Sequence, residues 1–237
     1  MKKHIHAAMA GVLMITPVAA FADDNGWSGQ GEMGLAISKG NTDSQTLVGS
    51  LGLGKEDVRW THSLGASFLY GKNDGVQNAR RYEVFGTTGY RLNERSYMFG
   101  SLRNERDRFA SNEYQWTVAA GYGHQLINDD TTQLKMEIGP GYRWAKLQGV
   151  RIHNNEAILR GFMDFSRKLT PTTSLYDTLL VEAGSDNTFA SNNLGLQVQM
   201  TDALALKAGF EVRHNTDVLP GTKRTDTLTT VNVVYGF

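Results

Sequence analysis

Apolar and polar side chains alternate with a period of two residues through most of the chain beyond residue 26. The alternation is clearest at 203–215, where one face is apolar and the other carries Lys207, Glu211 and Arg213. Successive side chains of a strand point to opposite faces, so this period predicts β-strands. We expect twelve strands, at 27–38, 44–54, 58–71, 79–91, 95–107, 112–126, 132–146, 154–168, 172–184, 188–200, 203–215 and 225–237. The segment 172–184 alternates poorly, and its faces stay unassigned.

These strands are long enough to cross a membrane. A tilted transmembrane strand needs about 9–11 residues, and each expected strand meets that length. Open strand edges cannot exist in lipid, so spanning strands must close on themselves. We therefore predict an all-β fold, a transmembrane antiparallel up-and-down β-barrel of 12 strands, formed by one domain over residues 23–237.

Outward aromatic residues support a membrane location. One group is expected near one set of strand ends and comprises Trp60, Tyr90, Tyr97, Tyr122 and Phe237. The other group is expected near the opposite ends and comprises Tyr70, Tyr82, Tyr114, Tyr142 and Trp144. Two such belts typically flank the apolar band of an outer-membrane barrel. Short connections such as 93–94 also alternate with longer ones at 72–77, 148–154, 184–191 and 216–224, as expected for periplasmic turns and outer loops.

The two ends of the chain indicate export to the outer membrane. Lys2 and Lys3 precede a short apolar stretch, and Ala20-Phe21-Ala22 fits a cleavage site, so residues 1–22 are predicted to be a signal peptide. At the other end, a strand stops at Phe237, which resembles the C-terminal signal of bacterial outer-membrane barrels. We therefore expect a bacterial outer-membrane protein of the Gram-negative envelope. Its expected partners are membrane lipid, lipopolysaccharide and the insertion machinery, which would bind the C-terminal strand, and the barrel itself is expected to be a monomer.

Composition agrees with this assignment. The mean hydropathy is −0.37, as expected when lipid-facing and lumen-facing residues alternate. Lys and Arg number 24, as do Asp and Glu, so nothing indicates a nucleic-acid partner. The chain has no cysteine and therefore no disulfide. Pro140 lies in an expected strand and cannot donate a ladder hydrogen bond, so we predict a bulge or local irregularity at 139–141.

Several short motifs resemble one family. They are the first-loop segment Ser38-Lys39-Gly40-Asn41-Thr42-Asp43, Asp107-Arg108-Phe109, Gly139-Pro140-Gly141-Tyr142, and the C-terminal segment from Asp217 through Pro220 and Thr225-Asp226-Thr227 to Tyr235-Gly236-Phe237. In this order they resemble the YdiY-like family of salt-induced outer-membrane proteins, built on a domain of unknown function. The resemblance implies an outer-membrane barrel. It implies no substrate, cofactor or catalytic residue.

Charged residues on the inward face are the main functional candidates. Seven are basic and five are acidic: Glu32, Glu83, Arg91, Lys135, Glu137, Arg143, Arg160, Asp164, Lys168, Lys207, Glu211 and Arg213. They can form a salt-bridge network that fills a narrow lumen, or they can line a small porin-like channel with a weak preference for anions. Twelve strands lie between filled eight-stranded barrels and open porins, so both interpretations stay open.

The alternative function is an outer-membrane enzyme acting on lipid or envelope substrates. Such an enzyme needs a histidine near a nucleophile or a carboxylate. His62 and His124 are expected to face lipid, and a pair between His214 and Asp217 is conceivable, but no nucleophile is placed beside them. Asp129-Asp130 and Asp186-Asn187 offer too few ligands for a metal site. We therefore expect a passive channel or structural protein with no catalytic residue, metal or cofactor.

Overall fold

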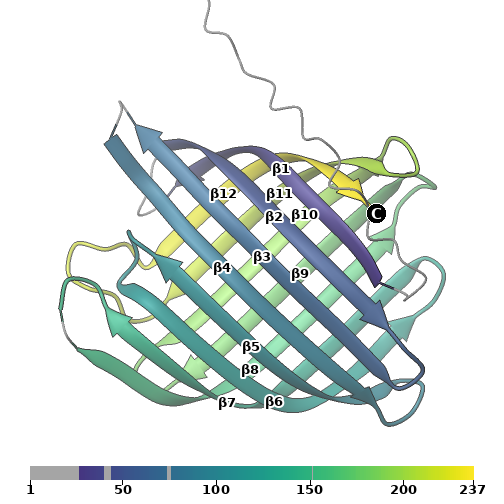
Figure 1. Cartoon of the computed structure of the whole chain (residues 1–237), viewed down its shortest axis with the longest axis horizontal. Coiled ribbons are helices and arrows are strands. Elements are labelled where there is room, and N and C mark those ends of the chain that lie inside the picture. The colour runs from purple at the N-terminus through teal and green to yellow at the C-terminus, as the bar shows by residue number, and fades with distance from the viewer. Residues whose placement is uncertain (1–26, 40–43, 74–75, 151) are drawn as a thin grey trace, which may run out of the picture.

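The computed structural model describes residues 27–39, 44–73, 76–150 and 152–237. Twelve antiparallel strands form a closed barrel (Figure 1). They are β1 (Trp27–Lys39), β2 (Ser44–Glu56), β3 (Trp60–Asn73), β4 (Val76–Arg91), β5 (Ser96–Asp107), β6 (Asn112–Asn128), β7 (Thr132–Leu147), β8 (His153–Lys168), β9 (Thr173–Gly184), β10 (Thr188–Gln199), β11 (Leu204–Asn215) and β12 (Thr225–Gly236). The predicted twelve-stranded barrel is confirmed. Among the described residues, no helix is long and apolar enough to cross a membrane.

Some sequence predictions fall outside these residues. The proposed signal peptide, 1–22, and part of the first-loop motif, 40–43, are not among the described residues. The signal peptide therefore stays a prediction.

The barrel closes where the last strand meets the first. β1 and β12 pair from Gln30↔Gly236 to Lys39↔Thr227. Just beyond this ladder, Gly29 N donates to Phe237 O at 2.7 Å, and Phe237 N donates to Gly29 O at 2.8 Å. The Phe237 ring lies over Gly29, where a Cβ would approach it to 2.3 Å. The terminal residue therefore completes the backbone hydrogen bonding and packs against the seam.

We call the end where β1 begins and β12 ends the terminal end, and the opposite one the distal end. β3 and β4 run further toward the distal end than the sequence predicted, since β3 ends at Asn73 and β4 begins at Val76. β9 ends at Gly184 and β10 begins at Thr188, as the predicted strand bounds have it, which leaves only three residues between them. The predicted long connections at 72–77 and 184–191 are therefore wrong. The distal connection 216–224 remains the long one, against three or four residues for each connection at the terminal end.

The outer surface carries an apolar band between aromatic residues. Trp60, Tyr90, Tyr122 and Tyr235 are on outward positions toward the terminal end, and Tyr70, Tyr82, Trp116, Tyr142 and Trp144 are on outward positions toward the distal end. Tyr97 does not belong to this surface, as the sequence had suggested. Its hydroxyl donates to Glu137 at 2.8 Å inside the barrel, because odd-numbered residues of β5 face inward.

Pro140 interrupts one ladder without shifting its register. β6 and β7 pair at Ala119↔Gly141 and again at Tyr122↔Ile138, and the pairs between them are missing. The two pairs are three residues apart on both strands, so neither strand has an extra residue and there is no bulge here. The predicted irregularity is therefore a gap in the pairing. β7 keeps continuous pairing with β8 on its other side. The missing proline N–H explains the gap, and the outward position of Pro140 leaves the inner face to glycines.

Glycine lets the two backbones approach closely at this gap. A Cβ on Gly139 would lie 2.1 Å from Ala120 O, and a Cβ on Gly121 would lie 2.2 Å from Ile138 O. Neither contact can be relieved by moving a flexible side chain. Both positions therefore require glycine.

Gly139→Ala should destabilise the barrel by about 3 kcal/mol or more, since the added methyl overlaps backbone atoms. Gly161→Ala is the matched control, because a Cβ there meets nothing within 4 Å. Unfolding by urea in lipid vesicles, followed by the electrophoretic mobility shift of folded barrels, measures the difference. Equal stability of the two variants would show that β6 and β7 do not approach as described.

Deletion of Phe237 should impair barrel assembly while export continues, since both hydrogen bonds to Gly29 are lost from the seam. Phe237→Tyr, which keeps the backbone and the ring, is the control. The fraction of protein with folded mobility in isolated outer membranes is the readout. Normal insertion of the truncated chain would contradict the role of this residue in closure.

Candidate functional site

The lumen contains a cavity of about 1250 Å³ that begins at the terminal end. Its lining includes terminal-end residues such as Glu56, Asn93 and Asn128, and it reaches inward to Arg103 and Arg213. None of the described residues in the distal connections lines it. The cavity is therefore a cup that opens at the terminal end and stops at a layer of charged side chains.

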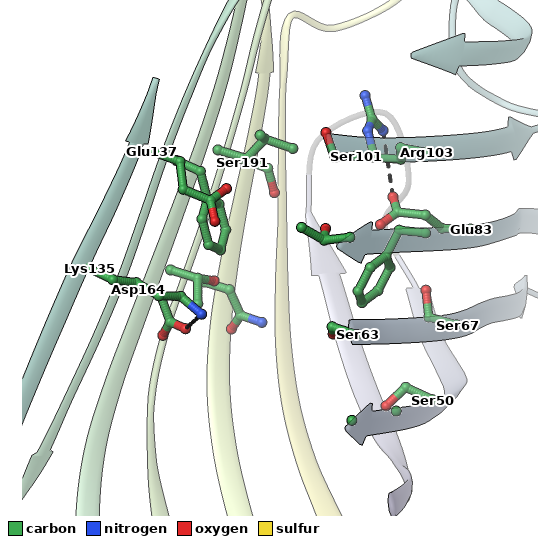
Figure 2. Close-up of a pocket in the computed structure, with 18 of the residues that line it drawn as sticks. Ser50, Ser63, Ser67, Glu83, Ser101, Arg103, Lys135, Glu137, Asp164 and Ser191 are labelled. Atoms are coloured by element: carbon green, nitrogen blue, oxygen red, sulfur yellow. Dashed lines mark ion pairs between the residues drawn. The ribbon is translucent and has the colours of Figure 1, made fainter. Parts of the chain in front are cut away.

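The two walls of the cup differ in chemistry. Figure 2 shows Ser50, Ser63 and Ser67 on strands of one wall. Lys135 and Asp164 lie on the facing wall, where they pair at 3.0 Å. Small hydroxyl-bearing residues on β2 and β3 leave space that long side chains would fill, so this part of the lumen is wide enough for water.

Charged side chains cross the barrel above the cup. Arg213 on β11 donates to Glu105 on β5 at 2.6 Å, although these strands lie on opposite sides of the ring. Arg103 on β5 donates to Glu182 on β9 at 2.6 Å and 3.2 Å. Direct contact between opposite walls narrows the lumen at this layer. We call these residues, together with Arg81, Glu83 and Glu211, the cross-lumen layer.

The remaining members, on β4 and β11, add further ion pairs to the layer. Arg81 on β4 donates to Glu211 on β11 at 2.8 Å, which is a third contact across the barrel. Glu83 lies 3.7 Å from both Arg103 and Arg213. Arg103 and Arg213 therefore each face more than one carboxylate. The charged side chains form a network rather than isolated pairs.

An aromatic ring packs between the arginines. Phe189 is only 1% exposed, and its ring centre lies 4.9 Å from the Arg103 guanidinium and 4.8 Å from that of Arg213. Guanidinium groups are attracted to aromatic faces at this distance. Phe189 thus fills the space between two like charges and helps to hold both.

The distal mouth is also covered by backbone. In the connection 216–224, Leu219 N donates to Ser111 Oγ at 2.9 Å, and Asp217 N donates to Asn187 Oδ1 at 3.0 Å. Ser111 follows β5, on the opposite side of the ring from β11 and β12. Arg143 of β7 also donates to Asn187 O, in the connection between β9 and β10, and to Glu156 of β8. The connection 216–224 therefore reaches across the mouth above the cross-lumen layer.

The twelve charged residues proposed from sequence lie on inward positions of their strands. Eight of them form ion pairs in the lumen: Glu83, Lys135, Arg143, Asp164, Glu211 and Arg213, and Lys207 with Glu32 at 2.8 Å. Glu137 accepts from Arg160 at 2.7 Å. At the terminal rim, Arg91 pairs with Glu56, and Lys168 lies exposed opposite Ser174.

Sequence reasoning missed further inward charges. They include Arg81, Arg103, Glu105, Asp107, Glu156 and Glu182, and near strand ends Glu56 and Asp226. Six of these eight are acidic, so the excess of positive charge expected from the sequence disappears. Arg103 and Glu105 share a face with Tyr97 and Phe99, and these inward aromatics conceal the alternation.

The faces of β9 are resolved by its pairing. In the strand register, Glu182 lies opposite Arg160 of β8 and Phe189 of β10. Its inward side is shared by Tyr176, Thr178 and Leu180. Leu180 is apolar and faces inward, whereas Asp177 is acidic and faces outward. Because an apolar residue faces inward and an acidic residue faces outward, the segment 172–184 does not alternate. Glu182 could therefore not be assigned to a face from the sequence.

The histidines contact hydroxyl groups rather than carboxylates. His62 Nδ1 lies 3.0 Å from Thr88 Oγ1, and His214 Nδ1 lies 2.8 Å from Thr225 Oγ1, so the considered pair with Asp217 is not seen. His124 Nδ1 lies 3.1 Å from Ser96 Oγ on the outer surface. Ser96 is 7% exposed, and within the described chain no acidic residue contacts His124. This serine–histidine pair lacks the third group and the accessible hydroxyl of a hydrolase.

The acidic turn residues considered for metal have other roles. Asp129 Oδ1 accepts hydrogen bonds from Thr131 N and Oγ1 and from Thr132 N. The hydrogen bonds from Thr131, and then that from Thr132, hold the pKa of Asp129 below its usual value. The described part of the chain contains no group of three or more His, Cys, Asp or Glu that could hold a metal.

One family model and one relative match most of the chain. The family model described as "Protein of unknown function, DUF481" matches residues 31–237. The chain is 23% identical to the uncharacterized protein YdiY of Escherichia coli strain K12, over 85% of this chain and 80% of that protein.

Solved outer-membrane proteins share the fold. The NanC porin is similar with a TM-score of 0.60 and 10% identity, over 87% of this chain and 98% of the porin. A channel from Pseudomonas putida F1 gives 0.54 and 11%, over 94% of this chain and 100% of that one. The KdgM porin in complex with disordered oligogalacturonate gives 0.51 and 13%, over 88% and 99%. At these identities the likeness establishes the fold alone.

Glu182→Gln should destabilise the barrel by about 3 kcal/mol, because it removes the carboxylate charge that faces Arg103 and Arg143 in a buried site. Glu56→Gln is the matched control and should cost at most about 1 kcal/mol, since its pair with Arg91 is exposed. Urea unfolding in lipid vesicles measures both. Equal effects of the two substitutions would contradict a buried network.

Proposed function

The chain belongs to the DUF481 family, and we propose that it is a passive outer-membrane channel whose lumen is closed by the cross-lumen layer. Its similarity to outer-membrane porins and channels supports the location and the general class. The observation that carries the proposal is the cavity of about 1250 Å³, which a barrel filled by side chains would not contain. We infer that the lumen is a path for small solutes that is interrupted at one level.

Side chains rather than buried strands or helices form that closure. Arg103, Glu182, Arg213 and Glu105 can separate by rotation of their side chains, whereas the barrel wall keeps its hydrogen bonds. Such rotations need no unfolding of the barrel wall. The connection 216–224 would have to move with them. The channel is therefore closed in the described conformation and opens by rearrangement at the distal end.

The balance of lumen charges argues against strong selectivity. Lys207 and Arg213 are two of the seven basic residues from which a weak preference for anions was expected, but Glu32 pairs with Lys207 and three carboxylates face Arg213. Charges that are each paired with an opposite charge give little net field along the lumen. We propose that the open channel accepts small polar solutes of either charge.

The surroundings of the protein are part of the proposal. Both strand termini at one end are consistent with a periplasmic terminal end, from which the insertion machinery would bind the C-terminal strand. The outward aromatic residues would lie among lipid and, at the distal end, lipopolysaccharide. A role in salt conditions, as the YdiY-like resemblance implies, would be tested by the abundance of the protein in cells grown at increasing salt.

Planar-bilayer recording tests the closure. The wild-type protein should give rare conductance steps or none. A variant in which the three cross-lumen pairs are replaced by serine, and residues 217–222 by a Gly-Ser linker, should give frequent steps because both obstacles are removed. The replaced pairs are Arg103 with Glu182, Arg213 with Glu105, and Arg81 with Glu211. Folded electrophoretic mobility must first show that the variant is intact.

The matched control is Lys135→Ser with Asp164→Ser. It removes an ion pair with no net charge from the wide cup, and the channel should stay closed. Steady conductance of the wild-type protein would overturn the closure. A folded opening variant that never conducts would overturn the proposal that the lumen is a solute path.

A further inference from the structure

An acidic side chain faces outward at mid-height of the barrel wall. The β9–β10 ladder runs from Thr173↔Val198 at the terminal end to Ala183↔Thr188 at the distal end, and Thr178↔Asn193 is its central pair. Asp177 and Asn192 flank this pair on the outer face. Asn192 Nδ2 donates to Asp177 Oδ1 at 2.6 Å and to Thr178 O at 3.1 Å.

Most of the side chains around this pair are apolar; Arg167 of β8 and His214 of β11 lie one outward pair further along. Leu175 and Leu196 lie toward the terminal end, and Leu179 and Val181 lie toward the distal end, all on the same outer face. On the neighbouring strands, Phe165 of β8 is opposite Asp177 and Val212 of β11 is opposite Asn192. The other acidic residues of the described strands face the lumen or lie at strand ends, so Asp177 is an exception.

Lipid is an unfavourable environment for this pair. A charged side chain in the middle of a membrane costs several kcal/mol, and residues of this kind usually pair with other groups or mark a functional site. The apolar band of an outer-membrane barrel is about 25 Å tall, so a short aspartate at its centre cannot reach the headgroups. Among the described residues, Asp177 has a hydrogen bond only from Asn192. Its carboxylate can accept several more.

The same part of the wall also lacks interfacial aromatics. The outward positions of β8, β9, β10 and β11 carry no tyrosine or tryptophan, although β3, β4, β6, β7 and β12 each carry at least one. Tyrosine and tryptophan favour the membrane–water interface. One third of the circumference is therefore without the residues that suit contact with lipid headgroups. We call this surface the β8–β11 face.

In place of the monomer expected from the sequence, we propose that the β8–β11 face binds a second copy of this chain and forms a symmetric dimer in the membrane. Two barrels inserted in the same direction can be related only by an axis along the membrane normal. Each residue then meets partner residues at its own depth. At mid-height of the wall, the β8–β11 face of a second copy presents the partner's Asn192. This residue is a polar partner for Asp177.

The exchange of hydrogen bonds supports this arrangement. In the single chain, one N–H of Asn192 goes to Asp177 and the other to Thr178 O at 3.1 Å. In the dimer, the second N–H would donate to the carboxylate of the partner, and the reverse contact would follow by symmetry. Hydrogen bonds to a charged acceptor are stronger than those between neutral groups. Each carboxylate would then accept two N–H groups and be withdrawn from lipid.

Cysteine crosslinking in lipid vesicles tests this proposal, because the chain contains no cysteine of its own. Leu194→Cys places one thiol beside the pair, on an outward position that is 42% exposed. Val84→Cys is the matched control on the opposite side of the barrel, on an outward position that is 57% exposed. We expect at least about tenfold more crosslinked dimer at residue 194, a difference of about 1.4 kcal/mol in association.

A second variant separates the polar contact from general packing. Adding Asp177→Leu and Asn192→Leu to Leu194→Cys should remove most of the crosslinking while the barrel stays folded, since the face becomes fully apolar. Equal crosslinking at residues 84 and 194, undiminished crosslinking in the leucine variant, or crosslinking at residue 194 only to a different protein in native membranes would each overturn the proposal. These outcomes do not depend on conductance and therefore leave the proposed channel function to its own test.

Discussion

Backbone hydrogen bonding in lipid is the constraint on which this structure depends. Each strand must satisfy its N–H and C=O groups on both sides, and only a closed ring does so without an exposed edge. β12 returns to β1, and Phe237 and Gly29 exchange the last pair of bonds. Even Pro140, which cannot donate, leaves the register unchanged. The wall can therefore stay rigid while the side chains within it carry the function.

Closure of the wall creates an interior in which charges must pair. Arginine and glutamate side chains at the distal level reach across the lumen because partners on the opposite strands compensate for their loss of water. Where small residues replace them on β2 and β3, the same wall encloses open space. The contrast between a paired layer and an open cup is the basis of the proposed channel. Asp177 shows the same principle outside, where a charge without sufficient partners marks a surface that needs one.

Sequence periodicity was sufficient for the barrel, because a period of two and the length needed to span a membrane both depend on local pattern. It was also sufficient for many inward charges, from Glu32 to Arg213. It failed where a residue opposed the pattern: Tyr97 is inward, Asp177 is outward, and Leu180 conceals the face of Glu182. Contacts between opposite walls, such as Arg213 with Glu105, depend on which strands face each other across the ring. No local pattern contains that information.

An experimental structure of the protein in a lipid nanodisc, at a resolution that shows ordered water, tests the central claim most directly. The account predicts water within the cup from the terminal end up to the level of Arg103 and Glu182, and no water path from there to the distal mouth. A continuous column of water between the two ends, with Arg213 and Glu105 separated, would contradict it.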